Sequence, residues 1–229
     1  MSPPDWPTGK YGAILADPPW FWKSYKDFSG HGGPVMSTSR SARRHYDVLD
    51  YEQLKALPVS DLTLEDAVLF VWIIWPHLEQ AIDVISSWGF TYKTCAFCWV
   101  KAQTKQIDLL RDDMDGQVGL GFWTRANSEV CLLATRGKPK RLNADVRQAI
   151  LEPRREHSRK PSCVYERIER LVAGPYLELF ARTTRPGWTS WGNETRKFAP
   201  SVGGPAPSPS PEAGAELQPR PPTMIGGRS

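Results

Sequence analysis

The 229-residue sequence lacks several features that would assign it to other classes of protein. No apolar run is long enough to span a membrane, and residues 1–5 lack the basic and apolar segments of a secretory signal peptide. A G-x-G-x-x-G loop between a strand and a helix is also missing, so the dinucleotide-binding fingerprint is absent. These absences favour a cytoplasmic protein without a membrane partner.

Cysteine is scarce, with four residues in the chain. Cys95 and Cys98 form a lone C-x-x-C inside a predicted strand, where residues three apart face opposite sides and do not converge on a metal. A second pair of metal ligands is missing as well. We therefore expect no metal site and four reduced, mostly buried thiols.

Charge is also modest, with a net charge of +4 and a pI of about 8.9, which leans only mildly toward a polyanionic partner. The length and the 40% hydrophobic content suit one α/β domain with an appendage. We expect a lead-in at residues 1–10, a folded domain at 11–194 and a tail at 195–229. The tail is rich in Pro, Gly, Ser and Ala and cannot bury enough apolar surface to order itself.

One stretch organises the rest of the chain. Residues 13–16 are small or apolar and lead directly into Asp17-Pro18-Pro19-Trp20. An apolar run that ends at a turn is typical of a buried parallel strand, and proline cannot donate to a strand ladder, so the predicted strand at 11–17 must stop at Asp17. A carboxylate, a rigid turn and an indole then stand at the carboxyl end of a strand, where open α/β sheets bind ligands.

This cluster suits chemistry on the exocyclic amine of a purine, whose lone pair is delocalised into the ring. Asp17 can accept one N–H of the amine and the Pro18 carbonyl the other, while Pro19 stiffens the turn and Trp20 stacks on the base. Positioning and fixed dipoles would then supply most of the rate, without a strong base. The alternative is a plain strand end in which Asp17 caps nearby amides.

The motif resembles the catalytic motif of S-adenosylmethionine-dependent amino-group methyltransferases. With residues 11–16 it resembles the MT-A family in particular, which contains the eukaryotic mRNA adenosine methyltransferase and shorter bacterial and phage relatives. The resemblance covers most of residues 11–194. It implies a Rossmann-like, three-layer α/β/α sandwich with a mostly parallel sheet of about seven strands, permuted so that the catalytic motif precedes the cofactor motif.

The same resemblance implies S-adenosylmethionine as the cofactor. Lys160 precedes Pro161, which opens a predicted helix, and would hold the carboxylate of the cofactor's methionine part beside the helix N-terminus. Arg182 matches a position that contacts the ribose. The cofactor-binding residues implied in this way are Asp17, Lys160, Phe180, Arg182, Asn193 and Glu194.

Two long loops, at residues 21–49 and 101–122, are candidates for the acceptor surface. In the relatives, a loop directly after the catalytic strand covers the acceptor base, and its aromatic and arginine side chains suit a flipped base and its phosphates. The alternative is that the first loop is an ordinary solvated surface loop. Glu129, at the start of a predicted strand, could hold the acceptor or a loop, and the alternative is that it only caps the edge of the strand. The substrate-binding residues predicted are Trp20, Trp22, Arg43, Arg44, Tyr46, Asn127 and Glu129.

Basic side chains also recur between residues 136 and 160. Such a run can follow a nucleic-acid backbone, although a solvated face is the more general explanation of charge runs. Together with the arginines of the first loop, it favours a nucleic-acid partner.

Hydrophobic periodicity predicts the remaining elements. Strands are expected at 67–72, 90–100, 130–135 and 176–182. Helices are expected at 51–57, between Pro76 and Gly89, and from Pro161 to a point before Gly174, which lies past the helix end. The core-facing residues predicted for the last two helices are Leu78, Ala81, Ile82 and Ile85, and Val164, Ile168, Leu171 and Val172.

The sequence thus predicts methyl transfer from S-adenosylmethionine to the exocyclic 6-amino group of adenine in nucleic acid. The short chain favours a bacterial or phage enzyme acting on DNA. Three alternatives stay open: the same chemistry on RNA adenosine, methylation of the 4-amino group of cytosine, and a non-catalytic nucleic-acid-binding subunit. The recognition sequence, the strand preference and the oligomeric state stay open too, and a homodimer is compatible with the sequence.

Overall fold

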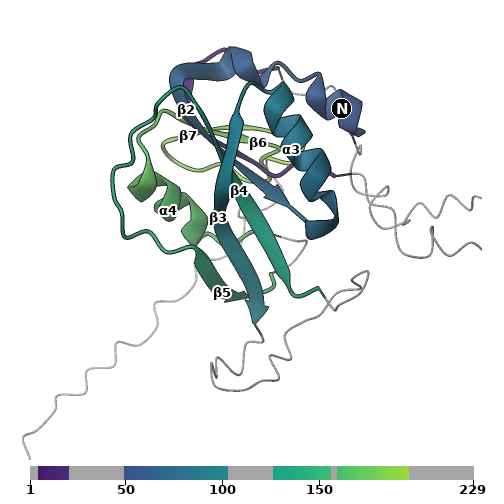
Figure 1. The fold of residues 1–229 in the computed structure, drawn as a ribbon, viewed down its shortest axis with the longest axis vertical. Coiled ribbons are helices and arrows are strands. Elements are labelled where there is room, and N and C mark those ends of the chain that lie inside the picture. Colours follow the sequence, from purple (N-terminus) through teal and green to yellow (C-terminus); the bar gives the residue numbers. More distant parts are fainter. Residues whose placement is uncertain (1–4, 21–48, 103–125, 156–158, 196–229) are drawn as a thin grey trace, which may run out of the picture. The chain divides into compact units, whose positions relative to one another are not determined.

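A computed structural model describes residues 5–20, 49–102, 126–155 and 159–195. These residues form a seven-stranded sheet in the order β5-β3-β4-β2-β1-β6-β7, with helices packed on both of its faces (Figure 1). Among the described strands, only β4 runs antiparallel to its neighbours, β2 and β3. The predicted mostly parallel α/β/α sandwich is therefore confirmed.

The elements have the following bounds. The strands are β1 (Tyr11–Ala16), β2 (Thr63–Ile73), β3 (Thr91–Ala102), β4 (Ser128–Arg136), β5 (Ala149–Pro153), β6 (Tyr176–Leu179) and β7 (Trp188–Trp191). The helices are α2 (Tyr51–Lys55), α3 (Leu78–Ser87) and α4 (Cys163–Leu171), with short 3-10 turns η2 (Val59–Leu62) and η3 (Trp75–His77). In the described part of the chain, no helix has both the length and the apolar character to cross a membrane.

Strand β1 lies inside the sheet and is buried on both faces. Ile14 and Ala16 pack in the core cluster that contains residues of α2 and α3, whereas Ala13 and Leu15 pack in the cluster that contains residues of α4. This alternation is what the period of two along a strand requires. The continuous apolar run in the sequence therefore has its expected origin in a strand covered on both sides.

The buried stripe of helix α3 matches the prediction at Ala81 and Ile85, with Leu78 packed against the same core cluster, but it includes Val84 rather than Ile82. Ala81, Val84 and Ile85 are buried, whereas Ile82 is only half-buried. Trp88, just past the helix end, is fully buried and donates its indole N–H to the carbonyl of Leu54 at 2.8 Å. This hydrogen bond joins the end of α3 to α2 and fixes which side of α3 faces the sheet.

Several boundaries also differ from the prediction. Strand β2 begins at Thr63 rather than at residue 67. Residues 64–66 are exposed, and Glu65 and Asp66 interrupt the apolar run on which the prediction was based. Helix α2 ends at Lys55, before Leu57. Strand β6 ends at Leu179 because Phe180 has a φ of 62°, in the left-handed region that interrupts a strand.

The prediction that Cys95 and Cys98 face opposite sides of a strand is wrong. The pairing of β3 with β4 shifts register between Cys95 and Phe97, and both thiols pack against the core cluster on the α3 side. A bulge adds one residue to a strand, so it reverses the alternation that the prediction assumed. The four cysteines are free, and of these Cys131 is buried while the other three are half-buried rather than mostly buried.

The direction of the chain connections locates the site. From β1 the chain passes through α2 to β2 on one side, whereas the chain through α4 returns to β6 on the other side of β1. Helix α4 and helix α3 lie on opposite faces of the sheet (Figure 1). The strand order thus reverses between β1 and β6, and a crevice outside the carboxyl ends of strands at such a point is the usual ligand site of an α/β sheet.

Candidate active site

Asp17 begins the site at the carboxyl end of β1. The strand ends at Ala16, one residue earlier than predicted, and the Asp17 N–H still donates to the carbonyl of Leu179 on β6 at 3.4 Å. The two prolines then reverse the chain, and the N–H of Trp20 donates to the Pro18 carbonyl at 2.8 Å. The carboxylate of Asp17 is held at this edge by its own backbone, with its side chain 18% exposed.

A chain of four charged side chains runs across this edge. Lys160 Nζ lies 2.9 Å from Asp17 Oδ1 and 3.2 Å from Glu129 Oε2, and Lys101 Nζ lies 2.6 Å from Glu129 Oε1. All four side chains are between 12% and 18% exposed, so water screens them weakly. Two carboxylates and two ammonium groups therefore balance one another in a largely enclosed place.

The pKa shifts follow from this enclosure. Burial alone would raise the pKa of Glu129, but the ammonium groups of Lys160 and Lys101 outweigh it and lower that pKa to about 2. Burial alone would lower the pKa of Lys160, but the carboxylates of Asp17 and Glu129 raise it. Glu129 and Lys160 are therefore both charged at neutral pH.

Arg182 and Glu194 extend the charged cluster toward the end of the domain. Arg182 Nη2 lies 3.8 Å from Asp17 Oδ2, and Arg182 Nε lies 4.0 Å from Glu194 Oε2. In this segment Phe180 has a φ of 62°, in the left-handed region. Left-handed backbone at a bulky side chain is costly and is concentrated at functional sites.

A cavity opens beside Asp17 and Lys160. It is bounded by the end of β1, the end of β6 with the segment that follows it, and the start of α4. Its lining residues that bear on the chemistry are Asp17, Lys160, Glu178, Phe180 and Arg182. The cavity therefore coincides with the crevice at the reversal of strand order.

Glu178 is a buried acid in the wall of this cavity. Its residue is 8% exposed, and its Oε1 accepts a hydrogen bond from the hydroxyl of Tyr165 at 2.9 Å. Burial, with a smaller contribution from the negative charge of Asp17, raises the pKa of Glu178 to about 7 despite the hydrogen bond from Tyr165. Glu178 therefore titrates near neutral pH in the wall of the cavity.

Trp20 is held by a polar contact and by other aromatic rings. Its indole N–H donates to the carbonyl of Trp72 at 2.8 Å, and its ring lies parallel to that of His77 with centroids 6.1 Å apart. Tyr51 hydrogen-bonds His77 Nδ1 through its hydroxyl. Burial lowers the pKa of His77, which favours the neutral ring beside Trp20.

The predicted site residues fall into three groups. Asp17, Lys160, Arg182, Glu129 and Glu194 are joined by the ion pairs above, and Phe180 lines the same cavity. Asn193 is exposed at the end of the domain, and the Asn127 carbonyl accepts the N–H of Lys101 at 2.9 Å. The predictions for Trp22, Arg43, Arg44 and Tyr46 lie outside the described residues.

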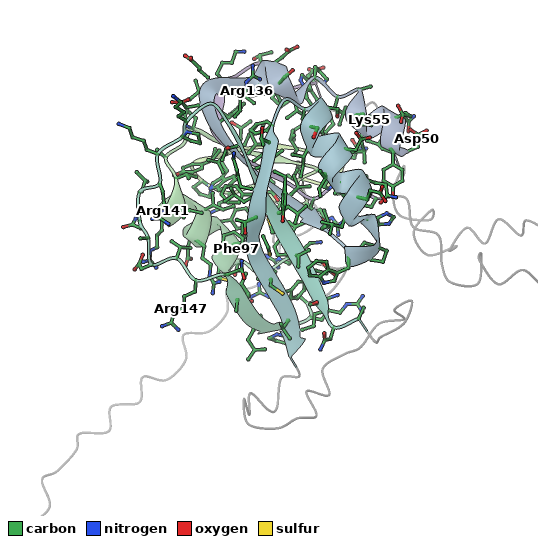
Figure 2. The ribbon with its side chains drawn as sticks, in the orientation of Figure 1. Asp50, Lys55, Phe97, Arg136, Arg141 and Arg147 are labelled. Carbon is green, nitrogen blue, oxygen red and sulfur yellow. The ribbon has the colours of Figure 1, made fainter. Side chains whose placement is uncertain are left out.

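The basic turn at residues 136–141 starts at the end of the sheet opposite to Asp17, beside the amino end of β2. Arg136 pairs with Ala67, near the amino end of β2, because β4 is antiparallel to β2. It donates to the Thr63 hydroxyl at 2.9 Å, which is a structural contact. Arg141 and Arg147 lie on the loop that precedes β5 (Figure 2). Of the basic run, Arg159 and Lys160 line the cavity.

Three further residues of the site were missed by sequence reasoning. Lys101 was assigned to a loop, but β3 continues through it to Ala102. Glu178 stands between two leucines in an apolar strand, and an acid in such a run was a usable signal. His77 carried no signal, because a single histidine after a proline fits an ordinary turn. Among the described residues, no group of three or more His, Cys, Asp or Glu side chains could hold a metal ion.

Comparison with known proteins gives the family. The profile of the MT-A70 family matches residues 11–194. The Type II methyltransferase M.MunI of a Mycoplasma species is 33% identical over 201 residues, covering 83% of this chain and 80% of that protein. The N(6)-adenosine-methyltransferase MT-A70-like protein of Drosophila melanogaster is 28% identical over 190 residues, covering 81% of this chain and 27% of that protein.

A third relative, the human N(6)-adenine-specific methyltransferase METTL4, is 28% identical over 210 residues, covering 82% of this chain and 38% of that protein. The chain thus spans most of the Mycoplasma protein but well under half of these two animal proteins. The family match includes the Asp17 turn, the Lys160 segment and strand β6, which ends at Leu179. This chain therefore belongs to the MT-A70 family.

Proposed function

We propose that this chain transfers a methyl group from S-adenosylmethionine to the exocyclic 6-amino group of adenine in DNA. The observation that carries the proposal is the Asp17–Lys160 ion pair, which stands in the wall of the cavity between β1 and β6. Family membership supports methyl transfer, and the names of the relatives support adenine as the acceptor.

The residues of the cavity fit the cofactor. The amino-acid end of S-adenosylmethionine carries one ammonium and one carboxylate, and the pair offers one carboxylate, on Asp17, and one ammonium, on Lys160. Arg182 in the cavity wall, and Glu194 beside it, would supply a donor and an acceptor for ribose hydroxyls. When bound, the cofactor supplies a methyl group on a positively charged sulfur.

Asp17 and Pro18 would hold the acceptor amine. A carboxylate has about four lone-pair positions, so Asp17 keeps acceptor capacity beyond its contacts with Lys160. The Pro18 carbonyl accepts one bond from Trp20 N–H and keeps a second lone pair. Two fixed acceptors draw the amine out of conjugation with the ring, and its surplus proton, acidic once nitrogen is alkylated, can pass to Asp17 or to water.

The neighbouring residues would position this pair. Glu129 and Lys101 fix the Lys160 ammonium, and the Trp72 carbonyl and the His77 ring fix the Trp20 indole, which we propose stacks on the target base. Preorganised groups act without reorganisation during the reaction, which is why such supports matter for rate. We further propose that residues 11–194 form the catalytic domain and that residues 195–229 form a tail outside it.

The test is to identify the methylated nucleoside. Full-length protein and cofactor labelled on the methyl group are incubated with single-stranded DNA, duplex DNA and RNA oligonucleotides, which are then digested to nucleosides. The proposal expects label in N6-methyldeoxyadenosine. Label in adenosine of RNA only would move the substrate to RNA, whereas label in cytosine, or none in any nucleic acid, would overturn the proposal.

Asp17→Asn tests the role of the carboxylate with little change in shape. We expect its turnover to fall by at least about 100-fold, while Asp145→Asn, which removes an exposed carboxylate paired with Arg170, leaves turnover near wild type. A residual Asp17→Asn rate within about tenfold of wild type corresponds to less than about 1.4 kcal/mol of barrier and would remove Asp17 from the catalytic role.

A further inference from the structure

We infer that Trp75 is a substrate-binding residue that stacks on a nucleobase next to the adenine undergoing methylation. This inference rests on the proposed function and adds to it a site for a second base. Trp75 lies in the 3-10 turn Trp75–His77, directly beyond the carboxyl end of β2. No sequence motif marked it, and it lies outside the cavity that holds Asp17 and Lys160.

Trp75 lies at the same end of the strands as the charged residues Asp17, Glu129 and Lys160. Its indole N–H donates to the hydroxyl of Ser128 at 3.2 Å, and Ser128 precedes Glu129 at the start of β4. Glu129 contacts Lys160, which contacts Asp17. A short series of contacts therefore leads from the Trp75 ring, through Ser128, Glu129 and Lys160, to Asp17, beyond the carboxyl ends of β1 and β2.

The exposure of Trp75 is unusual for its position. It is 49% exposed, although indole rings are normally well buried. The other large apolar residues that are exposed in the described part of the chain are Leu64, Tyr92 and Leu142. Leu64 and Tyr92 lie at the amino ends of β2 and β3, which is the end of the sheet opposite to Trp75. Leu142 lies on the loop before β5. Among the described residues, Trp75 is thus the one exposed large apolar side chain at the carboxyl ends of β1 and β2, where Asp17 lies.

Its hydrogen bond defines what this ring can bind. The indole N–H is its only polar group, and Ser128 uses it, so a ligand meets an oriented apolar π surface. Any nucleobase can stack on such a surface, because every base has a π face. A base inside a continuous duplex has both faces covered, so Trp75 requires a single strand or a locally opened duplex.

Trp20 has a different environment and does not duplicate this role. Its ring packs against the core cluster and lies parallel to His77, with its N–H held by the Trp72 carbonyl. Trp20 is therefore supported from within the domain beside Asp17, whereas Trp75 faces outward from the next strand. Two indoles on neighbouring strand ends can serve two bases of one strand.

Three substitutions separate stacking from support of the fold. Trp75→Phe keeps an aromatic face, Trp75→Leu keeps apolar bulk without one, and Trp75→Ala removes both. Tyr92→Ala, which removes an exposed aromatic ring from the opposite edge, is the matched control. Each variant is assayed for the KM and kcat of methylation of an adenine-containing single-stranded DNA oligonucleotide, for its affinity for S-adenosylmethionine by calorimetry, and for its melting temperature.

The inference expects KM for the oligonucleotide to rise at least about fivefold in Trp75→Leu and Trp75→Ala, with kcat and cofactor affinity near wild type. Trp75→Phe should remain within about threefold of wild type, as should Tyr92→Ala. Equal KM values for the Phe and Leu variants, or values within twofold of wild type for both, overturn the inference even if the Ala variant fails to fold. A wild-type protein that methylates no adenine instead overturns the proposed function.

Discussion

Glu129 holds two lysines at once, so removing its charge should destabilise the protein in a pH-dependent way. In Glu129→Gln the amide keeps the shape but leaves the ammonium groups of Lys101 and Lys160 with one carboxylate fewer. The lysines lower the pKa of Glu129 from 4.5 to about 2. A shift of about 2.5 units at 1.36 kcal/mol each amounts to roughly 3 kcal/mol of stability at neutral pH.

The sign of the pH dependence follows from the lowered pKa. The unfolded chain binds this proton at about pH 4.5, whereas the folded protein binds it only near pH 2, so the stabilisation is present above pH 4.5 and is lost as the pH falls to about 2. We expect Glu129→Gln to be roughly 3 kcal/mol less stable than wild type at pH 7, and the difference to be about half as large at pH 3.

Urea unfolding at pH 7 and pH 3 measures this difference. Glu166→Gln is the matched control, because Glu166 is an exposed acid on α4, and it should stay within about 0.5 kcal/mol of wild type at both pH values. A Glu129→Gln protein less than about 1 kcal/mol below wild type at pH 7, or a difference that does not shrink in acid, would refute the reasoning that ion pairing outweighs burial at this site.

Three further predictions concern the cavity and its surroundings. Burial raises the pKa of Glu178 to about 7, so folding opposes the ionisation of this carboxyl. The free energy of unfolding, measured in urea, should therefore fall more steeply from pH 5 to pH 8 in wild type than in Glu178→Gln. An equal fall in the two proteins would contradict this. Gly192→Ala should cost about 2 kcal/mol or more, since a Cβ would lie 2.4 Å from the Ala181 carbonyl oxygen, and an unchanged melting temperature would mean that this backbone relaxes freely. Lys160→Ala should weaken S-adenosylmethionine binding at least about tenfold by calorimetry, relative to the exposed-lysine control Lys138→Ala, and equal affinities would exclude Lys160 from the cofactor site.

The family and the general fold could be predicted from short motifs. The Asp17-Pro18-Pro19-Trp20 motif led to the expectation of the MT-A family and of a mostly parallel α/β/α sandwich, and both are confirmed. The motif is informative because proline ends a strand ladder by removing a donor, an effect that depends on the local chain alone. The apolar runs of β1 and β2 were visible for the same kind of reason, because their burial on both faces leaves a continuous signal.

Other features depend on register and could not be read along the chain. The bulge in β3 turns Cys95 and Cys98 to the same face, against the alternation that a regular strand predicts. The buried stripe of α3 follows from the anchoring of Trp88 on Leu54, residues 34 apart in sequence. The basic turn after β4 was interpreted, together with the arginines of the first loop, as favouring a nucleic-acid partner. Because β4 is antiparallel to β2, this turn starts beside the amino end of β2, whereas Asp17 follows the carboxyl end of β1.

The sequence by itself determined where the Asp17 turn stands, because an apolar run that meets Asp-Pro-Pro is typical of a buried strand that ends at the carboxylate. Only the tertiary structure decided which charges meet that carboxylate. Lys160 reaches Asp17 across 143 positions, and Lys101 reaches Glu129 across 28, through the pairing of strands and the docking of α4. Ion pairing needs proximity in space and exclusion of water, and both arise from packing rather than from the order of residues.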